Sequence, residues 1–481
     1  MSNRKCAVVC GGGPSGLAAA IKLHQLGWQE IHLVERQEDI QSFDRGKAFN
    51  YQLDGRGQKM LADIGIGEDT VKTYGVANLK SVFTAYGPDG KAKELTIPFV
   101  LKDKQTAYWI TRTALLEMIF ERLEEVNIDG HIKLMFGQSF ESLEVEDGRT
   151  VAKISDASGK KISLHPDIVL GCDGLNSNLR ASLADQPSLN AVDFTMVSKP
   201  SASSSLLYKV IRLPSNIKVN GESVEVTDNL RSYIFNSSYS AFNEKLSLFS
   251  LPVARENEPR TANIILPDTH RLWTIDTAKG LRDYLEEGFP QLDMDEVFPP
   301  EEIESFLERR AGKFPDPQYS PKVVAQLGES ADKTNCVVIG DAAHSFPPDL
   351  GLGVNSALED VYLLGQEIEA QPDNLTEAAK TYEKTRLPES QALTRLVRTV
   401  FPHQYRHVPW RFNFSLAKLL AQIGLARISG GLIDEPTFRL SQDERITYTQ
   451  LERRRIMTDA TFYAILVGSI VGLYYLVRLI F

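Results

Sequence analysis

Cysteine is scarce in this chain, and positive charge is not in excess. Four cysteines among 481 residues, Cys6, Cys10, Cys172 and Cys336, are too few for a disulfide framework. Each lies in or beside an apolar, strand-like run, so we expect small buried thiols in a reducing compartment and no metal site. Lysine and arginine number 53 against 63 acidic residues, a formal net charge of −10. A nucleic-acid partner is therefore not expected.

Long apolar runs are also rare, and none opens the sequence, so we expect no secretory signal. The exception is residues 460–477, which carry no charged side chain and lie between Arg453–Arg455 and Arg478. As a helix this run would be about 27 Å long, close to the hydrocarbon core of a bilayer. We expect a membrane span over residues 460–479 with the folded body on the cytosolic side. The alternative is a buried core helix.

The composition is that of a folded protein, with 42% hydrophobic and 24% charged residues. The length suits two or three domains.

The chain opens with an apolar run at 5–10, a Gly11-x-Gly13-x-x-Gly16 turn and a helical pattern. Gly11 allows a tight turn, Gly13 lets the backbone approach a diphosphate, and Gly16 lets the helix pack closely. Glu35 follows at the end of the next strand, where a carboxylate meets ribose hydroxyls. This unit predicts a dinucleotide site without distinguishing FAD from NAD.

Two further apolar strands end in a carboxylate followed by glycine or proline. One ends in Asp173-Gly174, and the other delivers Asp341 ahead of a loop that leads into a helix near Asn355. A carboxylate at such a strand end can hold a polyol hydroxyl. A helix N-terminus can face a ring oxygen that becomes anionic on reduction.

In this order and spacing the three motifs resemble those of the class A FAD-dependent aromatic hydroxylases, the 4-hydroxybenzoate hydroxylase type. The resemblance covers about residues 5–395. The stretches 44–50, 55–58, 111–115 and 385–388 are most similar to the kynurenine 3-monooxygenase branch, which also has a C-terminal membrane anchor. The resemblance implies an α/β fold. A Rossmann-like FAD-binding domain (1–75, 111–185 and 326–395) is interleaved with a mixed β-sheet substrate domain (76–110 and 186–325), followed by a helical region (396–458) and the anchor.

The resemblance also implies which residues contact the ligands. The cofactor set is Gly11, Gly13, Ser15, Gly16, Glu35, Arg36, Arg45, Arg112, Asp173, Gly174, Asp341, Pro347, Gly351, Gly353, Val354 and Asn355. The substrate set is Ser81, Phe99 and Val400, at positions where the kynurenine enzymes carry an arginine for the substrate carboxylate, a tyrosine and an asparagine. No side chain is assigned as a catalytic acid or base, and we expect His344 to be structural.

The implied reaction uses NADPH to reduce FAD, and the reduced flavin then forms a C4a-hydroperoxide with O₂ that transfers one oxygen atom to the substrate. A kynurenine-type substrate is the first expectation. A lipophilic substrate from the membrane, such as a polyprenyl phenol, a terpenoid or a sterol precursor, is the second. A flavin reductase and a binding protein without turnover remain alternatives.

The amphipathic run 410–425 is either a core helix that closes the substrate pocket or a surface helix on the membrane. The resemblance implies the mitochondrial outer membrane, and the same tail fits the endoplasmic reticulum. The sequence does not indicate an oligomeric state.

Overall fold

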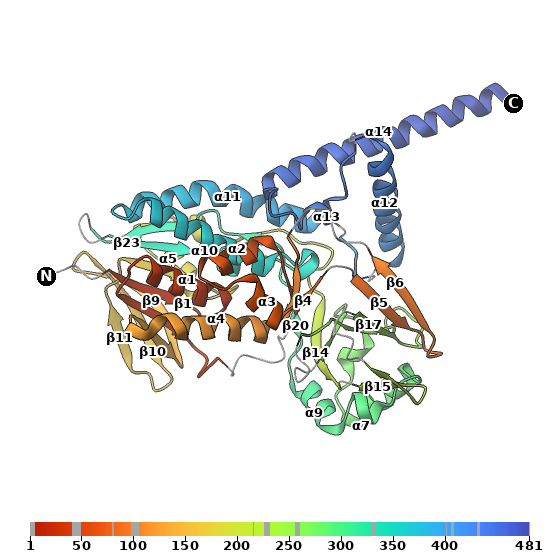
Figure 1. Ribbon diagram of the computed structural model, residues 1–481, viewed down its shortest axis with the longest axis horizontal. Helices are drawn as coiled ribbons and strands as arrows, with labels where there is room; N and C mark the ends of the chain where they lie inside the picture. The colour runs from red at the N-terminus through yellow and green to blue at the C-terminus, as the bar shows by residue number, and fades with distance from the viewer. Residues whose placement is uncertain are drawn as a thin grey trace.

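Two lobes and a pair of projecting helices make up the molecule (Figure 1). The computed structural model describes residues 5–40, 50–78, 81–97, 105–214, 216–225, 231–254, 260–329, 333–400, 402–405, 408–430 and 433–480. The larger lobe is an α/β body that contains both the first residues and most of the helices, and the smaller lobe is built on a second sheet. This mixed α/β architecture confirms the coarse fold class expected from the sequence.

The larger lobe is organised around a six-stranded sheet in the order β22-β23-β12-β1-β2-β8. The strands are β1 (Cys6–Cys10), β2 (Glu30–Glu35), β8 (Ile132–Phe136), β12 (Ile168–Gly171), β22 (Val324–Leu327) and β23 (Thr334–Val338). All neighbouring pairs are parallel except β22 with β23. β1 is buried over its whole length, and this continuous apolar character is typical of a parallel strand covered on both faces.

Helices from three distant segments pack on this sheet. They are α1 (Pro14–Gln25), α4 (Arg112–Val126), α5 (Asn178–Ala184), α10 (Gly353–Ala370) and α11 (Leu375–Thr399). Two short helices, α2 (Gly55–Asp63) and α3 (Glu68–Tyr74), lie beside a small sheet of β3 (Asn50–Leu53), β7 (Tyr108–Thr111) and β4 (Val76–Ala77). The antiparallel strands β9 (Gln138–Glu146), β10 (Arg149–Asp156) and β11 (Lys161–Leu164) form a further sheet ahead of β12.

The smaller lobe contains a mixed seven-stranded sheet in the order β20-β14-β19-β18-β17-β5-β6. Its strands are β5 (Ser81–Tyr86), β6 (Ala92–Ile97), β14 (Leu207–Leu213), β17 (Arg231–Asn236), β18 (Ser247–Ser250), β19 (Arg260–Leu266) and β20 (Gly312–Lys313). β5 pairs in parallel with β17, which joins an early segment to a much later one. α7 (Ala278–Gly288), α8 (Met294–Val297) and α9 (Pro300–Glu308) cover the sheet and share a second hydrophobic core with it.

The remaining short elements connect these parts. They are β13 (Val197–Ser198), β15 (Asn216–Val219), β16 (Glu222–Glu225), β21 (Gln318–Tyr319), β24 (His344–Ser345), α6 (Ala191–Phe194), α13 (Thr437–Leu440) and the 3₁₀ turns η2 (Asn127–Asp129), η3 (Arg271–Thr274), η4 (Gly340–Ala342) and η5 (Pro348–Leu350).

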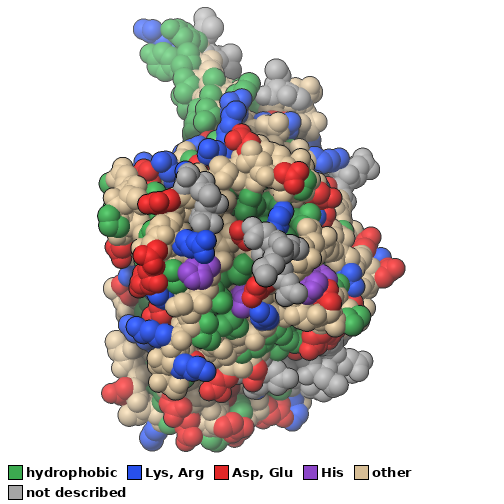
Figure 2. Space-filling model, turned by 90° about the vertical axis from the view of Figure 1, so that its left-hand side faces the viewer, with side chains coloured by type: hydrophobic (Ala, Val, Ile, Leu, Met, Phe, Trp, Pro, Cys, Tyr) green, Lys and Arg blue, Asp and Glu red, His purple; other side chains and the backbone are tan. Residues whose placement is uncertain are grey.

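Two C-terminal helices project from the body, α12 (Pro409–Ile428) and α14 (Tyr448–Ile480). α14 is long and apolar enough to cross a membrane, and its apolar surface extends away from the body (Figures 1 and 2). Little of its apolar stretch is buried, so it is not a core helix. On α12, Trp410, Phe414, Leu420 and Ile428 are between 59% and 80% exposed. The core-helix interpretation of 410–425 is therefore wrong for this face of α12.

Candidate cofactor and substrate site

The three predicted motifs follow the carboxyl ends of three adjacent parallel strands, β1, β12 and β23. The main chain links them directly, because the Cys172 N–H donates to the Cys10 carbonyl at 2.8 Å and the Ile339 N–H donates to the Gly171 carbonyl at 2.9 Å. In open α/β sheets this edge is where ligands bind. The structure thus brings Gly11, Asp173 and Asp341 to one edge.

The first turn is shaped by glycines with different constraints. Gly11 has a φ of +99°, and a Cβ there would lie 2.4 Å from the Cys172 carbonyl oxygen. A Cβ on Gly16 would lie 1.8 Å from the Gly11 carbonyl oxygen, so only glycine lets α1 pack on its own turn. Gly13 differs, because no atom lies within 4 Å of its Cβ position. That side of the turn is open to an approaching ligand.

Two helices begin at this edge without a side-chain cap. Gly13 precedes α1 and Leu352 precedes α10, and neither provides a capping oxygen. By contrast, α2, α4, α5 and α11 are capped by Asp54, Thr111, Ser177 and Asn374. Free N–H groups and the helix dipole make such an N-terminus favourable for anionic oxygens. Ser15 lies in the first turn of α1, and Gly353 and Val354 lie in the first turn of α10.

Glu35 ends β2 beside the glycine turn. Its Oε2 accepts from the Gly12 N–H at 2.7 Å and its Oε1 accepts from the Gln37 N–H at 2.9 Å. A Cβ on Gly12 would lie 3.0 Å from the Glu35 side chain, so Gly12, which the motif leaves unspecified, is also constrained. Arg36 is exposed next to Glu35. The backbone holds the Glu35 carboxylate in place, and each oxygen retains a lone pair.

Asp173 carries a buried polar atom for which the described residues offer no hydrogen-bond partner. Its Oδ2 accepts from the Leu179 N–H at 3.2 Å, whereas Oδ1 is buried without a partner. Burial raises the pKa of this carboxyl group. Gly174 follows with a φ of +77° and no atom near its Cβ position. An unsatisfied buried oxygen is uncommon and indicates a missing donor.

Arg180, which sequence reasoning did not select, ties two of the loops together. Its guanidinium donates to the Leu175 carbonyl at 2.9 Å and to the Ala342 carbonyl. It thus fixes the loop after Asp173 against the loop that contains Asp341.

Asp341 lies near Arg112 and His344. The side chain of Asp341 is exposed at this edge, and Arg112 and His344 lie close enough to act on its charge. The Arg112 guanidinium also lies beside the hydroxyl group of Tyr51, a residue of β3 that sequence reasoning missed. The start of α4 and the loop after β23, which are far apart in the chain, therefore meet at the Asp341 carboxylate.

His344 belongs to a buried ion-pair network behind the site. Its Nε2 lies 2.8 Å from Asp360 Oδ2, and Arg386 pairs with the other oxygen of that carboxylate. Burial alone would raise the pKa of Asp360, but Arg386 and His344 lower it to about 2. Asp360 also accepts from the Gly340 N–H at 2.8 Å. This geometry fits the structural role expected for His344.

The loop before α10 is held by Asn355. Its Oδ1 accepts from the Asp54 N–H at 3.0 Å, and its Nδ2 donates to the carbonyl groups of Gln52 and Gly351. The amide side chain of Asn355 is therefore occupied by hydrogen bonds within the protein. Gly351 has a φ of +64°, and Pro347 begins the turn that leads to it.

The predicted substrate residues are not gathered by the described contacts. Ser81 begins β5 in the smaller lobe, and Val400 is buried with Leu350 and Leu352 next to the loop before α10. Phe99, and Arg45 from the cofactor set, lie outside the described residues. A cavity of about 510 Å³ opens beside the Asp173-Gly174 loop and is lined by Leu175, Ser204, Lys313 and Phe314, among others.

FAD fits the described residues. The open side of Gly13, the uncapped helices and the orphaned Asp173 oxygen match a ligand that carries a diphosphate, hydroxyl groups and a polar ring.

The comparisons with known proteins agree with this fit. The FAD binding domain family, FAD_binding_3, matches residues 5–205 and 322–397. A kynurenine 3-monooxygenase from Salinispora arenicola is 26% identical over 82% of this chain and 78% of its own. The enzyme of that name from Sus scrofa is 22% identical over 97% and 91%.

Solved structures show the same fold. The tetrameric form of 2-methyl-3-hydroxypyridine-5-carboxylic acid oxygenase aligns with a TM-score of 0.56 at 16% identity, over 84% of this chain and 93% of its own. PqsL of Pseudomonas aeruginosa, in complex with 2-aminobenzoylacetate, aligns with a TM-score of 0.55 at 18% identity, over 86% and 100%. The family match spans more than half of the sequence. The chain therefore belongs to the FAD binding domain family and is an FAD-dependent monooxygenase.

Proposed function

We propose that this chain uses NADPH and bound FAD to insert one atom of O₂ into an electron-rich substrate, as a kynurenine 3-monooxygenase-like enzyme. The observation that carries the proposal is the meeting of Gly11, Asp173 and Asp341 at one sheet edge, between two uncapped helix N-termini. When bound there, FAD would accept hydride from NADPH and activate O₂ for oxygen transfer.

The protein itself would bind FAD, orient it and neutralise its negative charges. The free N–H groups of α1 would hold the diphosphate of FAD, and Glu35 would accept hydrogen bonds from its ribose hydroxyls. Asp341 would hold the ribityl chain, and the N–H groups in the first turn of α10 would stabilise negative charge on the flavin ring. The Asp360–Arg386 ion pair and Arg180 hold the loops that would surround the flavin ring. We name no side chain as a proton-transfer group.

The substrate class has two candidates. Kynurenine is the first, because the relatives of that name cover most of the chain. Ser81 favours the second, a lipophilic substrate, because serine offers no cation for a carboxylate where those enzymes carry arginine. The exposed apolar surfaces of α12 and α14 support the same alternative, since they would hold the body against a lipid phase.

We also propose that α14 anchors the chain in a membrane with the body on the cytosolic side, in the mitochondrial outer membrane or, second, the endoplasmic reticulum. Arg453–Arg455 precede the apolar stretch, and positive charge favours the cytosolic side.

The test uses detergent-purified, FAD-loaded protein with NADPH, ¹⁸O₂ and L-kynurenine, read by mass spectrometry. One ¹⁸O atom on the aromatic ring would establish both the oxygen transfer and the substrate. Labelled product from a lipophilic phenol alone would establish the second candidate. NADPH consumption matched by H₂O₂, with no labelled product from either class, would contradict the monooxygenase proposal and indicate a reductase.

A further inference from the structure

Two clusters of metal-ligating side chains lie at the opposite edge of the parallel sheet from the cofactor site. One is Cys6, Glu30 and His32, and the other is His24, Asp129 and His131. Both lie at the amino ends of β1, β2 and β8. Figure 2 looks onto this end of the molecule, where histidine side chains reach the surface.

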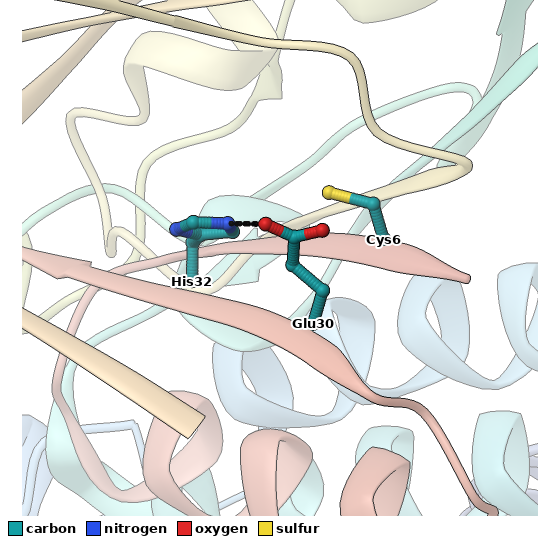
Figure 3. A group of neighbouring side chains, drawn as sticks. All are labelled: Cys6, Glu30 and His32. Atoms are coloured by element: carbon teal, nitrogen blue, oxygen red, sulfur yellow. Dashed lines mark hydrogen bonds and ion pairs between the residues drawn. The ribbon is translucent and has the colours of Figure 1, made fainter. Parts of the chain in front are cut away.

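The Cys6 cluster is already neutralised. Glu30 points between His32 and the Cys6 thiol (Figure 3), and its Oε1 pairs with Lys133 at 2.9 Å. Burial raises the pKa of Cys6 to about 12. A cation would have to displace the lysine and deprotonate a thiol that holds its proton strongly, so this cluster offers a poor site.

In the other cluster the three ligand atoms lie within 4.8 Å of one another, and two of their separations match those of a metal site. Asp129 Oδ2 lies 2.9 Å from His24 Nε2 and 3.0 Å from His131 Nδ1. Two bonds of about 2.0–2.1 Å that meet at 90–110° separate their ligand atoms by roughly 2.9–3.4 Å. Both imidazoles therefore converge on one carboxylate oxygen. Within the part of the chain that the structure describes, the recorded ion pairs of Asp129 are with these two histidines alone.

The backbone holds these ligands in place. His24 lies in the last turn of α1, and Asp129 ends η2. Gly130 has a φ of +70°, which turns the chain so that His131 returns beside Asp129, and the His131 N–H donates to Asp129 Oδ1 at 3.1 Å. Asn127 closes the same turn through two hydrogen bonds of 2.8 Å with Ile132. Side chains held by their supports lose little entropy when they bind a metal.

We propose that His24, Asp129 and His131 bind a divalent transition-metal ion of the Zn²⁺ class. Two imidazole nitrogens and one carboxylate oxygen are ligands that Zn²⁺ accepts, and water would complete the coordination because the Asp129 and His131 side chains are 44% and 39% exposed. The ion replaces the protons between the rings and the carboxylate. It ties the end of α1 to the turn before β8, far from the flavin edge.

The test is equilibrium dialysis of FAD-loaded, chelator-treated protein against Zn²⁺, with the bound metal measured by elemental analysis. We expect one Zn²⁺ per chain, a higher Tm with Zn²⁺, and at least a tenfold weaker affinity in both His24→Gln and His131→Gln. His165→Gln, which changes an exposed histidine elsewhere, is the matched control and should bind as wild type.

Two results would overturn the proposal. One is unchanged Zn²⁺ binding in His24→Gln and His131→Gln, and the other is loss of binding only in Cys6→Ser. The flavin absorbance of each variant shows whether it is folded, so a misfolded protein is not mistaken for a lost site. Because the cluster is remote from the cofactor edge, the rate of flavin reduction by NADPH should be the same in all folded variants.

Discussion

At the scale of single residues, the glycine turn separates packing from ligand approach. Gly16→Ala should abolish folding of the larger lobe, because its methyl group would meet the Gly11 carbonyl oxygen at 1.8 Å. Gly13→Ala should fold normally, since its φ is −71° and nothing lies within 4 Å, yet bind FAD at least tenfold more weakly. Far-UV circular dichroism and FAD fluorescence titration measure the two effects. Wild-type FAD affinity in Gly13→Ala would contradict the assigned diphosphate site.

Asp349 gives a pH-dependent prediction. Its carboxyl group is buried in the loop before α10, where the nearby polar groups of Ser203, Gln404 and Tyr405 lower its pKa less than burial raises it. Burial raises its pKa to about 7. The folded chain therefore keeps a proton between about pH 4 and pH 7 that the unfolded chain has released, and the free energy of unfolding falls as the pH rises through that range.

Asp349→Asn should remove this dependence. At pH 8 the variant should be more stable than wild type by up to about 4 kcal/mol, and the difference should shrink towards pH 4. Denaturant unfolding at several pH values measures it, with the exposed Asp268→Asn as control. A variant that is less stable than wild type at pH 8 would show that the buried carboxylate is satisfied.

Sequence reasoning identified some of these residues and missed others for a physical reason. Gly11, Gly16, Asp173 and Asp341 stand at fixed offsets from apolar strands, so a local pattern reveals them. Arg180 and Tyr51 act through partners that are far away in the chain, and no local pattern encodes that meeting. The cofactor-binding roles stay predictions until FAD binding is measured in their variants.

At the scale of elements, amphipathicity alone did not decide where α12 belongs. One face of α12 is formed by exposed residues that recur at helical spacing. They are Trp410, Phe414, Ala417, Ala421, Gly424 and Ile428. The spacing predicts this stripe, but it does not predict whether the stripe faces the core or the solvent. In the structure the stripe is exposed.

This outward face should bind lipid. Trp410→Ser with Phe414→Ser should reduce the fraction of protein that sediments with anionic vesicles by at least threefold in a chain that ends at Asp459, where α14 no longer dominates binding. Val192→Ser, which changes another exposed apolar residue, should leave the fraction unchanged. Equal sedimentation of both variants would exclude α12 as a membrane surface.

The first residues of α14 belong to the body. Tyr448 is buried, with the Arg56 guanidinium 4.7 Å from its ring centroid and that of Arg386 5.7 Å away. A chain that ends at Asp459 should therefore fold and bind FAD, whereas Tyr448→Ala should lose roughly 3–5 kcal/mol of stability. Chemical denaturation of the two proteins measures the difference, and a stable Tyr448→Ala variant would refute this packing role.

At the scale of the whole molecule, the two lobes have separate hydrophobic cores. We expect two calorimetric transitions, and FAD at about 100 times its Kd should stabilise only that of the larger lobe, by roughly 2.7 kcal/mol. A single transition that shifts as a whole would show that the chain segments connecting the lobes couple their unfolding fully.

The continuity of α14 has a mechanical consequence. No loop separates Tyr448, stacked on two buried arginines, from the apolar stretch that leaves the body. A flexible linker would let the body of an enzyme rotate freely relative to its membrane. A continuous helix instead fixes both the tilt of the body and its distance from the membrane. With the far end of α14 embedded as proposed above, the bilayer would set the orientation of the sheet edge that carries Gly11, Asp173 and Asp341, and any force on the helix would be transmitted to Arg56 and Arg386.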